Sequence, residues 1–197
     1  MNILFVTHKD IETTRKNLNH ILRLPFEKNI YFYNDLGVSE RDLNESLMIR
    51  RLATEYRDNI NDVFFTDTNL GIKKSIPAAL AWFFSEVTFG VIVEYDCIVS
   101  KGGFRFISEA ERRFSSYDNI TSISANNITK SDFVSELKFL NGSVTPIWGW
   151  ASWRSEVEKW LAYQPKFGFS LTQAIEKLND TNAYEWLVRN QSAYEKG

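Results

Sequence analysis

The chain is 197 residues long, with 44% hydrophobic and 24% charged residues, a composition typical of a globular protein and unlike that of disordered or fibrous chains. Its 25 acidic and 23 basic residues give a net charge of −2 and are mixed along the sequence, so no basic stripe indicates nucleic-acid binding. One cysteine and two histidines exclude an internal disulfide and a cysteine- or histidine-rich metal site, so any metal must be held mainly by oxygen ligands.

The length suits one domain, and no Pro/Gly/Ser-rich linker or internal repeat divides the sequence. The opening apolar run, residues 1–6, is too short for a signal peptide and lacks a basic leader, and no segment reaches membrane-spanning length. We therefore expect a single cytoplasmic domain over residues 1–197.

In chain order, short apolar runs alternate with segments of helical periodicity, the pattern of a parallel sheet with helices on its faces. Helices are predicted around residues 49–56 and 72–84, and Ser39 has the capping-box spacing to Asp42 before the first of them. Strands are predicted at about residues 3–6, 30–33, 63–66 and 89–93.

Beyond residue 96, the pattern indicates a helix at 104–114, a strand at 120–124 and a long loop or hairpin over 126–142. Helical spacing returns in Trp150, Trp153, Val157 and Trp160 and continues to about residue 188. The sequence thus predicts an α/β fold with a Rossmann-like, mostly parallel sheet flanked by helices and with a helical carboxyl-terminal third.

The predicted strand at 89–93 is followed by two carboxylates, Glu94 and Asp96, at the edge where open α/β sheets bind ligands. Residues two apart on a regular strand point to one face, so these acids could share a divalent cation; alternatively, they only form a solvated turn or cap the next helix. Thr7 and His8 end the first strand and Asp35 follows the second, at the same edge, although His8 and Asp35 also suit plain turns.

Two further segments offer candidate ligand contacts. Lys74 follows Gly71 at a predicted helix amino terminus, where anions are favoured, but the spacing of a phosphate loop is missing and a solvated lysine is the alternative. Trp148 and Gly149 precede a predicted helix, and an aromatic ring beside glycine suits stacking on a sugar or closure over a diphosphate. Trp148 is therefore predicted to be functional and Trp153 to belong to the core.

Three segments in order resemble a signature of GT-A glycosyltransferases, namely bacterial nucleotide-diphospho-sugar transferases distantly similar to animal N-acetylglucosaminyltransferases. They are Asn69-Leu70-Gly71, Val93-Glu94-Tyr95-Asp96-Cys97 and Ile147-Trp148-Gly149-Trp150-Ala151-Ser152-Trp153-Arg154. The resemblance covers residues 3–160 in order. It departs from the family at Tyr95, which stands where an acidic triplet usually has its middle acid.

The resemblance implies that Asp96 ligates Mn²⁺ or Mg²⁺ on the donor diphosphate and that Glu94 contacts the nucleotide ribose. Hard oxygen ligands suit these ions, which neutralise charge on the departing diphosphate. Residues 1–125 would form the donor-binding half, and residues 126–197 the acceptor-side loop and helices. The donor-binding candidates are Thr7, His8, Asp35, Asn69, Lys74, Glu94, Tyr95, Trp148 and Gly149.

The resemblance also implies an inverting reaction, which needs a base to take the proton of the acceptor hydroxyl. Glu185 resembles the acid beside a tryptophan that serves this role in related enzymes, but its spacing from Asn182 equally fits a capping box. Glu158 is the second candidate.

We therefore expect a metal-dependent glycosyltransferase that moves a sugar from a nucleotide diphosphate, by preference a uridine one, to a glycan or lipid-linked acceptor in cell-surface polysaccharide assembly. No nucleic-acid partner or transmembrane segment is expected, whereas a lipid-linked acceptor leaves room for peripheral membrane association. The alternative is a nucleotide-sugar-binding or scaffolding domain without catalysis, which Tyr95 keeps open. A nucleotidyltransferase is disfavoured because Thr7-His8-Lys9-Asp10 is not a Gly-rich basic loop.

Overall fold

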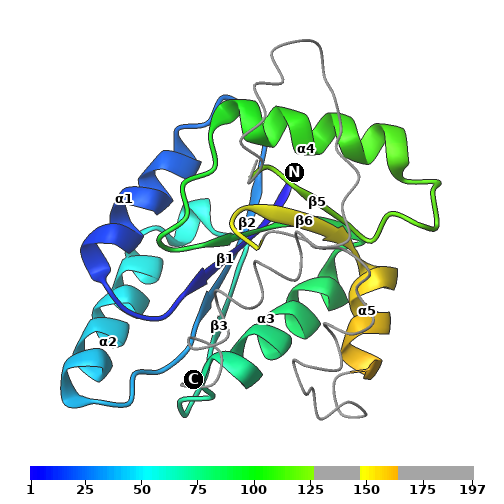
Figure 1. Cartoon of the computed structure of the whole chain (residues 1–197). Coiled ribbons are helices and arrows are strands. Elements are labelled where there is room, and N and C mark those ends of the chain that lie inside the picture. The colour runs from blue at the N-terminus through cyan, green and yellow to red at the C-terminus, as the bar shows by residue number, and fades with distance from the viewer. Residues whose placement is uncertain (127–146, 164–197) are drawn as a thin grey trace.

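Six strands and five α-helices make up the part of the chain that the computed structural model describes, residues 1–126 and 147–163 (Figure 1). The strands are β1 Asn2–Thr7, β2 Asn29–Asn34, β3 Asp62–Phe65, β4 Phe89–Glu94, β5 Ser122–Ser124 and β6 Trp150–Trp153. The helices are α1 Ile11–Leu22, α2 Glu40–Glu55, α3 Ile72–Glu86, α4 Lys101–Phe114 and α5 Arg154–Tyr163, and Arg57–Asn59 form a 3₁₀ turn. The predicted loop at 126–142 and the helices predicted after residue 163 lie outside the described residues, apart from Asn126 itself.

The sheet has the strand order β3-β2-β1-β4-β6-β5, and its first four members are parallel. The chain winds outward from β1 to β3 and then returns to the other side of β1 with β4, so the direction of winding reverses between β1 and β4. In open α/β sheets ligands bind at the carboxyl edge near such a reversal. The predicted α/β fold with a mostly parallel sheet is confirmed.

The prediction of a helix through Trp150 and Trp153 is wrong, because both residues lie in β6. This strand pairs antiparallel with β4, with Trp150 opposite Ile92 and Trp153 opposite Phe89. Residues three apart on a strand face opposite sides of a sheet, and the two rings do pack against different core clusters. The helix begins only at Arg154.

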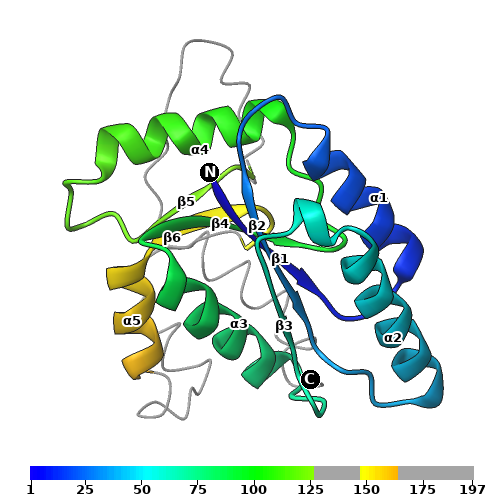
Figure 2. The same ribbon diagram turned by 180° about the vertical axis from the view of Figure 1, so that it is seen from behind.

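The strands divide their side chains between two cores. Ile3 and Phe5 of β1 share a cluster with residues of α1, α2 and α4, whereas Leu4 and Val6 share one with residues of α3 and α5. Figure 2 shows α1 beside α2 and α3 beside α5, in agreement with this division.

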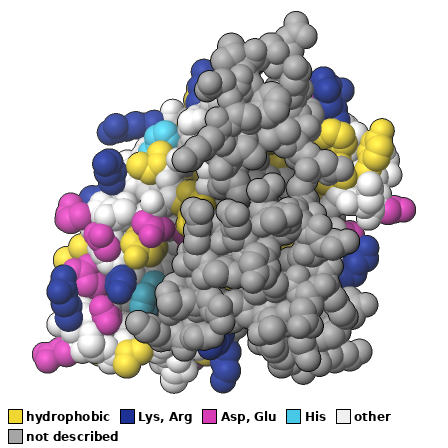
Figure 3. Space-filling view, viewed as in Figure 1, with side chains coloured by type: hydrophobic (Ala, Val, Ile, Leu, Met, Phe, Trp, Pro, Cys, Tyr) yellow, Lys and Arg dark blue, Asp and Glu magenta, His cyan; other side chains and the backbone are white. Residues whose placement is uncertain are grey.

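Lys and Arg side chains intermix with Asp and Glu over the face that α1 and α2 form at the left of Figure 3. Among the described residues, no helix is long and apolar enough to cross a membrane.

Two helix starts explain local features of the fold. The predicted cap of α2 is confirmed, because the Ser39 side chain accepts a hydrogen bond from the Asp42 amide at 3.1 Å. The helix between the first two strands, α1, was not predicted. It is capped by Asp10, whose backbone is left-handed with φ 64°. Its buried face includes two polar residues, Thr14 and Asn17.

Candidate functional site

Backbone hydrogen bonds continue past the ends of the parallel strands and hold the residues that follow them side by side. The Asp35 amide donates to the Thr7 carbonyl at 3.2 Å, and the Tyr95 amide donates to the Val6 carbonyl at 2.9 Å. On the outer side of β2, the Thr66 amide donates to the Asn34 backbone carbonyl at 3.2 Å. The ends of β1, β2, β3 and β4 therefore form one continuous carboxyl edge.

The two predicted acids lie at this edge, but they do not share a regular strand. The strand ends at Glu94, and the Cys97 amide donates to the Glu94 carbonyl at 3.0 Å to close a turn that contains Asp96. We call Glu94–Cys97 the acidic turn. Glu94 is half-buried and Asp96 is exposed. Burial, and to a smaller extent the charge of Asp96, raise the pKa of Glu94.

Tyr95 uses its ring for packing. The ring packs against the core cluster that α1, α2 and α4 share with the sheet. Burial raises the pKa of the Tyr95 hydroxyl, and the nearby acids Asp96, Asp10 and Glu94 raise it further. Tyr95, which replaces the middle acid of the triplet that the sequence resembles, thus contributes apolar packing between the acidic turn and the core.

A residue that the sequence analysis did not single out holds the acidic turn. Asn17 of α1 is 1% exposed, and its side-chain Nδ2 donates to the carbonyls of Glu94, Tyr95 and Cys97 at 3.0, 3.1 and 2.9 Å. If residues 11–21 form a helix, Ile11, Leu18 and Ile21 lie on one apolar face. Asn17 is a polar residue on that face, and this is the signal by which the sequence could have indicated it.

Asp35 is also buried, with 3% exposure, and organises the connection between β3 and α3. Its Oδ1 accepts from the Thr66 hydroxyl at 2.9 Å and from the Leu70 amide at 3.0 Å. The Asn69 side-chain amide donates to the Leu36 carbonyl. Two residues predicted to bind the donor therefore hold the loop that borders the edge.

Arg50 of α2 ties the ends of β2 and β3 together, which the sequence analysis also missed. Its Nε donates to Asn34 Oδ1 at 2.9 Å, and its Nη2 donates to the Thr66 carbonyl at 2.7 Å. The guanidinium lies 5.1 Å from the centroid of the Phe65 ring. Burial lowers its pKa, while Asp67 and Asp35 oppose that shift. No sequence pattern separates this arginine from the other arginines of the helix.

Thr7 and His8, at the end of β1, differ in how accessible their side chains are to a ligand. Thr7 is 1% exposed, and its hydroxyl donates to the Tyr33 carbonyl at 2.8 Å while accepting from the Asn34 side chain at 3.1 Å. His8 is partly exposed, and its Nδ1 lies 3.4 Å from the Asp35 carbonyl. The Thr7 hydroxyl is thus committed to the sheet, and His8 is the more accessible of the two.

The loop of Trp148 and Gly149 lies beside the acidic turn, although about fifty residues separate them in the sequence. Gly149 has φ 73°, and a Cβ there would lie 2.4 Å from Val99 Cγ2 and 3.8 Å from Cys97 Sγ. Only glycine therefore fits against the chain that leaves the turn. Trp148 is 45% exposed. Burial, with Glu94 and Asp96, raises the pKa of the Cys97 thiol to about 11.

Other predicted residues lie elsewhere or outside the described region. Lys74 is exposed in the first turn of α3, and Glu158 is exposed on α5. Trp153 packs against the core, with its ring centroid 5.2 Å from that of Phe89. Glu185 lies outside the described residues.

The donor atoms at the edge fit a divalent cation only with help from a substrate. Within residues 1–126 and 147–163, no three His, Cys, Asp or Glu side chains are grouped as metal ligands would be. Glu94 and Asp96 supply carboxylate oxygens, the ligand type that Mn²⁺ and Mg²⁺ prefer, and Mg²⁺ is commonly held by one or two carboxylates plus phosphates and water. The residues present therefore fit a metal that arrives with a diphosphate.

No protein-family model matches the chain, and no curated protein matches it. Among solved structures, it is similar to S. aureus TarS 1–349, with 15% identity and a TM-score of 0.57 over 80% of this chain and 48% of that chain. It is also similar to 4-diphosphocytidyl-2C-methyl-D-erythritol synthase from Anaerococcus prevotii, with 11% identity and a TM-score of 0.54 over 98% and 82% of the two chains. The mannosyltransferase PcManGT from Pyrobaculum calidifontis, solved with GDP-Man and Mn²⁺, gives 12% identity and a TM-score of 0.45 over 62% and 34%.

The chain thus spans about half the length of the TarS fragment that it matches and most of the length of the synthase. At these identities the likeness concerns the fold, which glycosyltransferases and a nucleotidyltransferase share. The chain has a GT-A-like α/β fold, as nucleotide-sugar transferases do.

Proposed function

We propose that the chain is a glycosyltransferase that binds a nucleotide diphospho-sugar at the carboxyl edge of its sheet. One observation carries the proposal: the acidic turn and the loop of Trp148 and Gly149 pack against each other beside the reversal of winding. The turn carries the exposed carboxylate of Asp96 and the loop carries the exposed indole of Trp148. These two groups suit a ligand that has both a charged diphosphate and a sugar ring. The GT-A-like fold supports this reading.

In this proposal Asp96 and the diphosphate hold Mn²⁺ or Mg²⁺ together. The ion, when bound, neutralises charge on the leaving diphosphate. Glu94, half-buried at the end of β4, accepts a hydrogen bond from a ribose hydroxyl when it is ionised. Trp148 stacks on the donor, and His8 borders it from the end of β1.

The base that takes the proton of the acceptor hydroxyl is proposed to be Glu185, with Glu158 as the second candidate. Glu158 is exposed on α5. Exchange of each glutamate for glutamine keeps the shape and removes the basicity. Transfer should nearly vanish in Glu185→Gln while donor affinity persists, and loss confined to Glu158→Gln would move the role there.

A nucleotidyltransferase is the second candidate, because the synthase from A. prevotii matches 98% of this chain. Such an enzyme needs an anion site after its first strand, and here the amino terminus of α1 is already occupied by acids. Asp10 accepts from the Thr13 amide at 3.0 Å, and Glu45 accepts from the Ile11 amide at 2.9 Å. Two carboxylates thus take the amides that would otherwise face a phosphate, which favours the glycosyltransferase.

The finer features of the proposal come from the sequence resemblance. They are a uridine donor, inversion at the anomeric carbon, a glycan or lipid-linked acceptor and a role in cell-surface polysaccharide assembly. The cytoplasmic location is a proposal that comes from the sequence itself and not from the resemblance. Peripheral membrane association belongs with the lipid-linked acceptor.

A product assay separates the candidate functions. We expect slow release of UDP from UDP-sugars in the presence of Mn²⁺ without acceptor, because water can replace the acceptor hydroxyl. A nucleotidyltransferase would instead release pyrophosphate from a nucleoside triphosphate and a sugar or alditol phosphate. Binding of the UDP-sugar without release of UDP, even with acceptor glycans, would favour the scaffolding alternative and contradict catalysis.

A further inference from the structure

We propose that Asn17 is a positioning residue, which fixes the acidic turn so that Glu94 and Asp96 are oriented to bind a metal-bound diphosphate. The role of the turn as a ligand site rests on the function proposed above. The role of Asn17 in holding the turn rests on the contacts of this residue alone.

The contacts are unusually concentrated for a single side chain. Three carbonyls of one turn, those of Glu94, Tyr95 and Cys97, lie within 3.1 Å of Asn17 Nδ2. An amide nitrogen carries two protons, so the three acceptors share them. The donor comes from α1, far away in the sequence, and it therefore locks the turn to a helix that packs on the sheet.

The same geometry leaves Asp96 outside. The carbonyl of Asp96 is not among the three that Asn17 binds, and its side chain is exposed while Asn17 is buried. The backbone on both sides of Asp96 is thus held from within, and the carboxylate faces solvent. A metal ligand on a fixed backbone needs less reordering when it binds.

Asn17 also lowers the stability of the fold in one respect, because one of its polar atoms is buried without a hydrogen bond. Its Oδ1 is buried and has no hydrogen-bond partner among the described residues, as is the case for the Thr14 hydroxyl one turn earlier on α1. Buried polar atoms without partners are rare in folded proteins. An apolar residue would remove this cost but would leave the carbonyls of Tyr95 and Cys97 without the donor that now reaches them.

The turn needs such support because its two carboxylates repel each other. Two like charges in one short turn lower their energy by moving apart. A mobile turn would relax by moving the carboxylates apart, whereas the proposed ligand needs Asp96 at its metal ion and Glu94 at its ribose at the same time. Outer partners that orient metal ligands typically change metal affinity by about 10- to 100-fold when removed.

Two variants and a matched control test the proposal. Asn17→Asp keeps the shape and removes the amide donors, and Asn17→Ala removes the whole group. Thr14→Val is the control, because Thr14 lies on the same buried face of α1 and its hydroxyl has no partner in the described part of the chain. Melting temperatures of all variants establish that each is folded.

The first measurement uses the ligand-free protein. Hydrogen exchange at the amides of Tyr95 and Cys97 reports on the turn, since these amides donate to Val6 and Glu94. We expect faster exchange at both amides in the two Asn17 variants and unchanged exchange in Thr14→Val. Unchanged exchange in folded Asn17 variants would overturn the claim that Asn17 holds the turn.

The second measurement is calorimetric titration with UDP and Mn²⁺. We expect the Asn17 variants to lose about 10- to 100-fold of their Mn²⁺-dependent affinity and Thr14→Val to bind as the wild type does. Faster exchange with unchanged affinity would overturn the positioning role. If the wild-type protein itself shows no Mn²⁺-dependent affinity, the proposed function fails, and with it the ligand role of the turn, whereas the exchange result still decides whether Asn17 holds it.

Discussion

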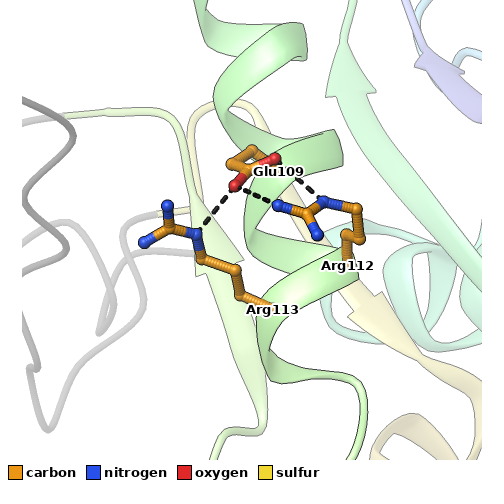
Figure 4. A network of polar contacts seen from close by, with 3 residues as sticks. All are labelled: Glu109, Arg112 and Arg113. Carbon is orange, nitrogen blue, oxygen red and sulfur yellow. Dashed lines mark hydrogen bonds and ion pairs between the residues drawn. The ribbon is translucent and has the colours of Figure 1, made fainter.

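The carboxyl edge of the sheet and the outer end of α4 use polar side chains in opposite ways. At the end of α4, Glu109 accepts hydrogen bonds from Arg112 and Arg113 at distances down to 2.7 Å, and these lower its pKa to about 2 (Figure 4). At the carboxyl edge, Asn17 and Asp35 bind backbone groups of distant segments. The hydrogen bonds of Glu109 join residues of one helix, whereas the edge contacts join different elements.

Burial decides which of the two sets matters for the fold. Exposed ion pairs gain little, because water already solvates both charges and ordering the side chains costs entropy. A buried contact is different, since removing one partner leaves the other unpaired in the interior. Short distances in a charged cluster are thus poor evidence for structural importance, and the following substitutions test this contrast.

Asp35→Ala is expected to have the largest effect on stability. It leaves the Thr66 hydroxyl and the Leu70 amide without their acceptor, and a loss of about 2 to 4 kcal/mol in the free energy of unfolding is expected. Urea unfolding measures this loss. Asp35→Asn keeps an acceptor oxygen and should lose less than half as much. A loss below about 1 kcal/mol for Asp35→Ala would contradict the assigned role of the buried carboxylate.

The tryptophans of the loop and of β6 sharpen the same contrast. Trp153 is half-buried, so Trp153→Ala should cost about 1.5 to 2.5 kcal/mol, half of what a fully buried ring costs. Trp148→Ala should change stability by no more than about 0.5 kcal/mol but should weaken donor binding more than Trp153→Ala does. Unfolding and donor binding are measured for both variants. A larger stability loss for Trp148→Ala together with a larger binding loss for Trp153→Ala would show that loop and core are assigned backwards.

Glu94→Gln gives a smaller effect that depends on pH. The pKa of Glu94 is raised in the folded protein above its ordinary value of 4.5, so the folded state favours the protonated form. Wild-type stability from this group is therefore gained as pH falls through the raised pKa and is lost as pH rises. Glutamine mimics the protonated form, so the variant should melt higher than the wild type at pH 8. The difference should shrink near pH 4, and a constant difference at both pH values would contradict the raised pKa.

Glu109→Gln is expected to have the smallest effect. It removes the charge that pairs with Arg112 and Arg113, but all three groups lie on the surface of one helix. The melting temperature in physiological salt should not change measurably. A drop as large as that of Asp35→Ala would break the contrast between the two regions.

The fold was largely predictable because it follows from apolar periodicity. Each parallel strand was predicted with overlapping bounds, and the Ser39 cap was predicted from its spacing to Asp42. The helical spacing of Trp150 and Trp153 was misleading, because pairing with β4 overrides the local pattern over so short a segment. The helix α1 was not named, since polar residues interrupt its apolar face.

The candidate site was predictable only in part, for a related reason. Residue type and position at strand ends placed Glu94, Asp96, His8 and Asp35 at one edge. The sequence does not reveal which of these side chains are committed to the protein itself, because that depends on contacts between distant segments. Asn17 shows this most clearly, because its three partners follow it by 77 to 80 residues.

The central claim is that the acidic turn binds a metal-bound nucleotide diphosphate, and Asp96 tests it most directly. Asp96 is exposed, so Asp96→Ala should leave the melting temperature unchanged. Calorimetric titration of UDP should show an affinity for the wild-type protein that rises with Mn²⁺, and Asp96→Ala should abolish that rise. Equal Mn²⁺-dependent affinity in the wild type and in folded Asp96→Ala would contradict the account.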